Sequence, residues 1–116
     1  MDVNCLFCRI ASGEVPATVV RETDSTLAFR DVKPKAPVHI LVIPKDHYAD
    51  VATLAQNDPR LAARVLETAA IVAEIEGLLA DGFRLIFNTG DYGGQEVQHA
   101  HAHLLGGAPL GPMLAR

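Results

Sequence analysis

Apolar side chains follow two different spacings along this chain, and each spacing predicts a different kind of element. Residues 18–21 and 26–30 are strand-like and flank the turn cluster at residues 23–25, which predicts a β-hairpin. The run HILVIP at residues 39–44 is nearly continuously apolar and ends in proline, as is typical of a buried central strand. Residues 83–88 are a further predicted strand, and the histidine run within VQHAHAHLLGG is the last one, before the glycine- and proline-rich tail GGAPLGPMLAR.

One long segment has helical spacing. Asp58 is a good N-cap, and Pro59 suits the first helical position. Gly82 is expected to end the helix. The apolar residues expected on one face of this helix are Leu61, Val65, Ala69, Val72 and Leu79.

The order of these elements predicts the fold class. Two strands, a central strand, a helix and two further strands, with short turns between neighbours, favour an α+β protein with an antiparallel sheet of about five strands and one long helix. The chain has 116 residues. This is an ordinary size for one domain, so residues 1–116 are expected to form a single domain with its own core.

Charge and composition exclude several classes of protein. The net charge is -4, and no run of Lys and Arg occurs, which argues against a protein that binds along the phosphate backbone of a nucleic acid. No stretch approaches the roughly 20 apolar residues of a membrane span. The first residues, MDVNCLFCRI, resemble no secretory signal, so we expect a cytoplasmic protein with neither a nucleic-acid nor a membrane partner.

The alternation of His99, His101 and His103 with two alanines is the main candidate for chemistry. On a strand, residues two apart share one face. A solvated polar face and a catalytic three-histidine zinc site are both open interpretations. The outer pair would span about 13 Å at roughly 3.3 Å per residue, so separate tasks for these two rings are favoured over one shared ion.

Cys5 and Cys8 have a CxxC spacing that is common in zinc sites. A reduced pair and a redox dithiol are the alternatives. Closure of a tetrahedral site needs two more ligands, and His47 together with His99 would supply them. A zinc ion held by these four residues would be structural, because it would tie the N-terminal segment to the sheet.

Several motifs in order resemble the histidine triad (HIT) family. They run from CLFCRI and GEVPA through LAFRD, HILVIPKDH and the FN strand to GGQEVQHAHAHLLGG and PLGPM, and so cover nearly the whole chain. The sequence is most similar to the Hint branch, which includes bacterial purine nucleoside phosphoramidases. The resemblance implies an α+β homodimer that hydrolyses a bond to the α-phosphorus of purine nucleoside monophosphate conjugates, either phosphoramidates or acyl-AMP.

The resemblance also implies roles for individual residues. His101 is the expected nucleophile that forms a covalent nucleotidyl intermediate, His103 contacts the phosphate, and His39 supports the nucleophile. Gln95 and the backbone N–H groups of GGQE are further expected donors to the phosphate. Members with a CxxC motif bind zinc, which here implies Cys5, Cys8, His47 and His99. The expected nucleotide-binding residues are Leu6, Phe7, Phe29, Asp31, Asn88, Gly94, Gln95, Glu96, His101 and His103.

Two features depart from the pattern of many animal relatives. Glu96 stands where they carry serine, and a carboxylate there bears on the choice of leaving group. The chain has no tryptophan, so specificity that depends on the C-terminal tail is not carried over. Apart from the covalent hydrolase, two functions stay open from the sequence: a zinc hydrolase that uses the triad as its metal site, and a nucleotide-binding sensor without turnover.

Overall fold

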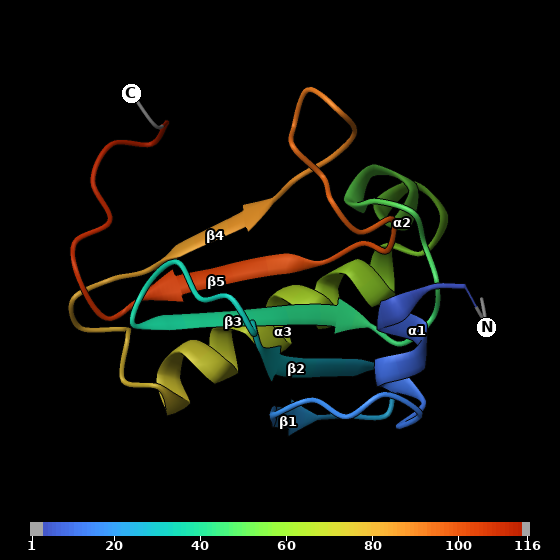
Figure 1. Ribbon diagram of the computed structural model, residues 1–116, viewed down its shortest axis with the longest axis horizontal. Helices are drawn as coiled ribbons and strands as arrows, with labels where there is room; N and C mark the ends of the chain where they lie inside the picture. The colour runs from blue at the N-terminus through green and yellow to red at the C-terminus, as the bar shows by residue number, and fades with distance from the viewer. Residues whose placement is uncertain (1–3, 115–116) are drawn as a thin grey trace.

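The computed structural model describes residues 4–114, which form one antiparallel sheet with helices on its two faces (Figure 1). The strands are β1 (Val19–Glu22), β2 (Thr26–Arg30), β3 (Val38–Pro44), β4 (Arg84–Phe87) and β5 (Ala102–Gly106). Their order across the sheet is β1-β2-β3-β5-β4. The helices are α1 (Leu6–Ala11), α2 (Val51–Asn57) and α3 (Pro59–Ile75).

This architecture confirms the predicted fold class. The five strands are antiparallel neighbours, β3 lies between β2 and β5, and α3 is the one long helix. The first four strands begin and end within one residue of the predicted bounds. The two short helices were not predicted, because six or seven residues are too few to establish a helical spacing in sequence.

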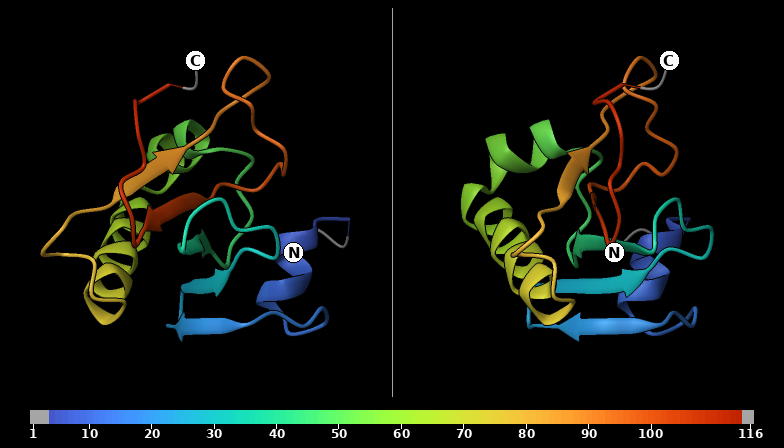
Figure 2. Two further views of the ribbon diagram at one scale, coloured as in Figure 1. Left: turned by 60° about the vertical axis from the view of Figure 1, so that its left-hand side comes forward. Right: turned by 90° about the vertical axis from the view of Figure 1, so that its left-hand side faces the viewer.

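The sheet is covered by α3 on one face and by α1 on the other (Figure 2). Alternate side chains of β2 and β3 therefore enter different clusters. Alanines 100 and 102 are fully buried beneath α3, where their small side chains let the helix lie close to β5. The α3 cluster includes Ala28, Ile40, Val42, Leu61, Val65, Ala69, Val72 and Leu104, and the α1 cluster includes Cys5, Phe7, Cys8, Leu27, Phe29, Leu41 and Ile43.

The long helix ends seven residues before the predicted stop at Gly82. Gly77 has a φ of 74°, a left-handed conformation that glycine adopts at little cost. Its N–H donates to the Glu74 carbonyl, and the N–H of Leu78 donates to that of Ala73, which together form a Schellman motif. The chain therefore turns away at Gly77, and Leu79 is 54% exposed although it was expected on the buried face.

The last strand begins later than predicted, so only one histidine of the triad lies in it. β3 and β5 pair in a register that matches Val42 with Ala102 and would place Pro44 opposite Ala100. Proline has no N–H, so the ladder of hydrogen bonds cannot continue at this point. The N–H of Ala100 instead donates to the Tyr48 carbonyl at 2.7 Å. His99 and His101 thus precede β5 and are held by the loop after β3.

Among residues 4–114, none of the helices has both the length and the apolar character needed to cross a membrane.

Candidate active site and metal centre

A pocket of about 270 Å³ opens on the face of the sheet that carries α1. It brings together eight of the predicted site residues. These are Phe7, Asp31, His39, Asn88, Gly94, Glu96, His101 and His103. The nucleophile and phosphate ligand expected from the sequence therefore lie side by side, with ring centroids of His101 and His103 5.0 Å apart.

Three predicted nucleotide-binding residues do not line this pocket. Leu6 is 46% exposed at the start of α1. Phe29 is buried behind Phe7, and the two rings meet edge to face with centroids 5.5 Å apart. Phe29 thus supports the pocket wall without forming it.

Gln95 also lies outside the pocket, because its side chain fastens the glycine-rich loop. Its amide nitrogen donates to the carbonyls of Ala49 at 2.7 Å and Val97 at 2.9 Å, and its amide oxygen accepts from the N–H of Gly90. The backbone N–H groups of Gly94 and Gln95 also donate within this loop. These expected phosphate donors are therefore already paired, and Gln95 holds the segment that presents Gly94 and Glu96.

A chain of hydrogen bonds fixes the proton positions on His39 and His103. The backbone N–H of Lys35 donates to Nδ1 of His39 at 3.1 Å, so this nitrogen carries no proton. Nε2 of neutral His39 therefore has the proton and donates to Nδ1 of His103 at 2.9 Å. In neutral His103 the remaining proton is then on Nε2, which makes this ring a donor to a ligand in the pocket.

His101 has the opposite tautomer. Its Nδ1 lies 2.6 Å from the carbonyl oxygen of His99, which can only accept, so Nδ1 carries the proton. Nε2 of the neutral ring is then an unprotonated nitrogen. The pocket thus combines a ring that offers a lone pair with a neighbouring ring that offers an N–H.

Burial keeps these imidazoles neutral. Desolvation is the main cause that lowers the pKa of His39 and of His101 below 6.5. Burial, followed by the charges of His101 and His39, lowers the pKa of His103 to about 4. At neutral pH the hydrogen-bond chain therefore keeps the order described above.

The low pKa of His103 predicts a loss of stability in acid. Between about pH 4 and pH 6.5 the unfolded chain binds a proton at this residue that the folded chain does not, so the free energy of unfolding falls as pH falls. The expected loss from His103 is about 1–2 kcal/mol between pH 7 and pH 5, discounted for partial exposure. Urea titrations of the wild type and of His103→Asn at both pH values measure it. Equal losses in the two proteins would contradict it.

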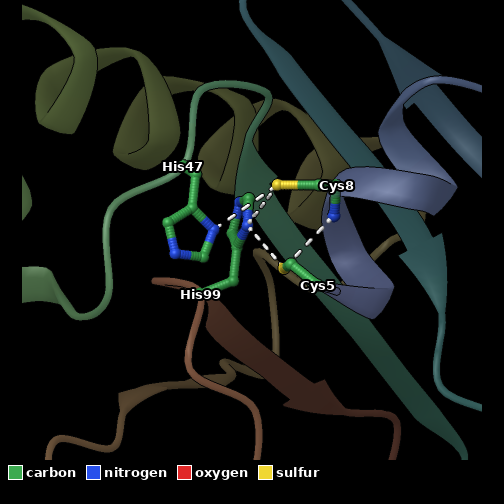
Figure 3. Close-up of side chains that lie close together, drawn as sticks. All are labelled: Cys5, Cys8, His47 and His99. Carbon is green, nitrogen blue, oxygen red and sulfur yellow. Dashed lines mark hydrogen bonds between the residues drawn. The ribbon is translucent and has the colours of Figure 1, made fainter. Parts of the chain in front are cut away.

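The second site gathers Cys5, Cys8, His47 and His99, whose candidate ligand atoms all lie within 4.8 Å of one another (Figure 3). Nδ1 of His99 is 3.3 Å from Sγ of Cys5 and 3.5 Å from Sγ of Cys8. Nδ1 of His47 is 3.4 Å from Sγ of Cys8. In a tetrahedral zinc site with ordinary bond lengths, sulfur and nitrogen ligands lie about 3.6 Å apart, so this arrangement fits a metal ion.

The environment of His99 prepares it as a ligand. Its Nε2 lies 2.8 Å from the carbonyl oxygen of Pro44 and must donate, which leaves Nδ1 unprotonated and directed at the thiols. A carbonyl behind a ligating imidazole is the usual support in metal sites. Burial is the main cause that lowers the pKa of His99, so the ring stays available as a neutral ligand.

A third grouping, Asp31, His39 and His103, has ligand atoms at similar separations. It differs in its proton order, that is, in which ring nitrogens of the histidines carry a proton. A metal ion on Nε2 of His39 would move the ring proton to Nδ1, where it would meet the N–H of Lys35. Two donors would then face each other. The donor behind His39 therefore disfavours a metal ion there, whereas the carbonyl behind His99 favours one.

Several residues that line the pocket were not predicted from the sequence. Lys35 lines the pocket, and its charge contributes to the lowered pKa values of His39 and His103. The sequence signal that could have identified Lys35 was its position four residues before His39. The other missed residues are the apolar Leu41, Ile86, Val97 and Leu105. Nothing in their local sequence separates them from core residues.

This fold is that of the HIT domain. The family profile of the HIT domain matches residues 12–110, and the chain belongs to this family. It is 47% identical over 110 residues to the purine nucleoside phosphoramidase of Escherichia coli K12, with 95% of this chain and 92% of that protein covered.

Two further relatives bear on the two sites. The 14 kDa zinc-binding protein of Brassica juncea is 46% identical over 107 residues, with 90% of this chain and 94% of that protein covered. A solved structure of a HIT family hydrolase from Clostridium thermocellum has a TM-score of 0.93 and 40% identity, and covers 99% of this chain and 100% of that one. Both of these proteins match most of the length of this chain.

Proposed function

We propose that this protein is a nucleotide hydrolase that cleaves the bond between the α-phosphorus of a purine nucleoside monophosphate and an amine. The observation that carries this proposal is the pair of opposite tautomers in one pocket. His101 offers an unprotonated Nε2, and His103 offers an N–H. The relationship to a purine nucleoside phosphoramidase supports the same reaction.

The reaction has two steps. Nε2 of His101 attacks phosphorus, and the amine leaves with the electrons of the P–N bond and takes up a proton from solvent. Water then attacks phosphorus and gives up a proton to solvent, the electrons of the P–Nε2 bond return to the imidazole, and the nucleoside monophosphate is released. The His99 carbonyl accepts from Nδ1–H of His101 and so stabilises the positive charge on the substituted ring.

His103 acts as a donor to the phosphate in both steps. Its Nε2–H stabilises negative charge that develops on the non-bridging oxygens. His39 holds this orientation, because it donates to Nδ1 of His103 while the Lys35 N–H holds its own ring. His39 is therefore a positioning residue for His103, whereas the family resemblance implied that it supports the nucleophile.

The remaining pocket residues supply the nucleotide subsites. Asp31 accepts the ribose hydroxyls, since a cis-diol donates well to a carboxylate. Phe7 provides apolar contact to the base. Asn88 donates to the Gly93 carbonyl at 2.7 Å and so shapes the loop beside the phosphate. Glu96 is exposed at the rim, where its carboxylate suits an amine leaving group, which becomes cationic on protonation, better than the carboxylate that an acyl-AMP would release.

Zinc is the proposed ion of the cysteine-histidine cluster. Two sulfur and two nitrogen ligands at tetrahedral separations are the usual structural zinc set, and a related protein from Brassica juncea is described as zinc-binding. Bound zinc would supply a fixed cross-link between α1, the loop after β3 and the segment before β5. The homodimer and the cytoplasmic location implied earlier stay predictions, and light scattering of the purified protein tests the first.

The proposed reaction is tested with adenosine 5′-phosphoramidate in water enriched in ¹⁸O. We expect AMP that contains one ¹⁸O on phosphorus. Rapid mixing followed by an alkaline denaturing quench should trap a peptide with an adenylyl group on His101, because the phosphorus–imidazole bond is labile in acid. Binding of AMP with no hydrolysis of any phosphoramidate would contradict the proposed enzymatic activity and favour a nucleotide-binding sensor.

The same assay separates the competing metal mechanism. Three results together would favour a zinc hydrolase. Labelled AMP forms, no peptide with a nucleotidyl group on His101 is found, and turnover is lost when the metal is removed from protein that stays folded. The proton order of His39 already argues against a metal ion in the pocket.

A further inference from the structure

The metal cluster and the pocket share one residue. His99 contributes Nδ1 of its ring to the cluster, 3.3 Å from Sγ of Cys5, and its carbonyl oxygen to Nδ1 of His101 at 2.6 Å. Only Ala100 separates the two histidines. A rotation of His99 that moved its ring away from the thiols would also displace the carbonyl that selects the tautomer of His101.

Phe7 makes a second connection between the sites. It lies in α1 between the two cysteines, and its ring meets the ring of His101 at an interplanar angle of 89° with centroids 5.1 Å apart. The same ring meets His99 at 69° and 6.0 Å. Phe7 also lines the pocket, so the position of α1 determines one side of the cavity beside His101.

The loop after β3 makes the third connection. His47 belongs to the cluster, and the next residue, Tyr48, accepts the N–H of Ala100 at 2.7 Å. Pro44, at the end of β3, accepts Nε2–H of His99. The segment from His99 to His101 is outside the ladder of the sheet, so these contacts take over the role that strand pairing has for His103.

We propose that the cluster of Cys5, Cys8, His47 and His99 is a positioning element for the nucleophile, so that metal binding there fixes the tautomer and the ring orientation of His101. This inference rests on the proposed nucleophilic role of His101. Without a metal ion, the loop after β3 and the His99 segment keep their hydrogen bonds through Tyr48 and Pro44, but α1 is held to both by sulfur contacts and side-chain packing in place of metal–ligand bonds. His101 then samples other ring orientations and the tautomer with a proton on Nε2, which cannot attack phosphorus.

Coupling of this kind acts in both directions. If metal binding favours the arrangement of His101 that receives the nucleotide, nucleotide binding must raise the affinity for the metal ion by the same factor. A cluster that only holds the fold together would stabilise the protein without this reciprocal effect. The two possibilities therefore differ in a quantity that does not depend on turnover.

The first experiment compares full-length zinc-loaded protein with metal-free protein at a temperature at which circular dichroism shows both to be folded. We expect kcat for adenosine 5′-phosphoramidate to fall about tenfold or more, as for loss of orientation of one reacting group, while KM changes less than threefold. ¹⁵N NMR of the histidine rings should show one tautomer of His101 in the loaded protein and a mixture in the metal-free protein. Equal kcat and identical His101 signals would overturn the proposal.

A second experiment covers the case in which the metal-free protein does not stay folded. Co²⁺ replaces zinc, and its visible absorption reports the ligand geometry. We expect AMP to shift this spectrum and to raise the Co²⁺ affinity severalfold; an unchanged spectrum and affinity at saturating AMP would overturn the coupling. Both this readout and the NMR signals are measured without turnover, so they remain decisive if the proposed hydrolase activity fails.

Variants in α1 provide a matched comparison. Phe7→Leu keeps all four ligands but removes the ring contact with His101, and should lower kcat at full zinc occupancy. Ile10→Val lies in the same helix and is partly buried, but does not line the pocket, and should leave kcat unchanged. Equal kcat in the two variants at equal zinc content would contradict the role of Phe7 in this connection.

Discussion

Replacement of His101 by asparagine is expected to lower kcat for a nucleoside phosphoramidate by about 10⁴-fold, the scale on which loss of a nucleophile acts. Asparagine keeps an N–H that can donate to the His99 carbonyl, which accepts from Nδ1 of the histidine at 2.6 Å. It has no nucleophilic ring nitrogen, so the covalent intermediate cannot form. Steady-state kinetics and the search for an adenylylated peptide measure the two consequences.

The same variant should still bind AMP, because the other pocket residues are unchanged. Isothermal titration calorimetry is expected to give a dissociation constant within about tenfold of the wild type, a difference of about 1.4 kcal/mol. Gln98→Ala, at an exposed position nearby, serves as the control with normal turnover. A His101→Asn protein with kcat within tenfold of the wild type would contradict nucleophilic catalysis by this residue.

Replacement of Cys8 by serine is expected to remove the stabilisation that zinc provides. Both cysteines are buried, and the cluster joins α1, the loop after β3 and the segment before β5. A ligand that binds only the folded chain contributes about 4 kcal/mol at a free concentration of 1,000 times its Kd. For a chain of this size that corresponds to a rise in Tm on the order of 10–15 °C.

Calorimetry with zinc and with a chelator measures this increment, and mass spectrometry of the native protein should count one zinc ion per chain. Cys8→Ser should show no increment. His39→Asn is the matched control, because it alters a histidine of the grouping whose proton order disfavours a metal ion. It should keep the full increment. A wild-type Tm that does not depend on zinc would contradict the proposed ion.

The strands were predictable because their signals are local. The apolar run at 39–44 identified β3 as the central strand, and the turn cluster between β1 and β2 identified their hairpin. The end of α3 also had a local signal, since Gly77 occupies the position after a helix end that glycine favours. The helix was nevertheless predicted to continue to Gly82, because apolar residues at helical spacing continue to Leu79.

The start of β5 had no local signal. Residues 97–101 have the alternation of a strand, but the ladder stops where Pro44 would have to donate. This outcome depends on the register between two strands that are far apart in the sequence. The expectation that all three histidines lie on one strand was therefore wrong for His99 and His101. Their rings still lie with His103 on the α1 side of the sheet, opposite Ala100 and Ala102.

By itself, the sequence determined the fold class, the central strand and the residue types available for chemistry, because side-chain periodicity and motif spacing depend on near neighbours. Only the tertiary structure decided which nitrogen of each imidazole carries a proton. His99 meets the carbonyl of a residue 55 positions away, and His39 meets His103 across 64 positions. A ring nitrogen donates or accepts according to the group it faces, so these long-range contacts make His99 a ligand and His103 a donor.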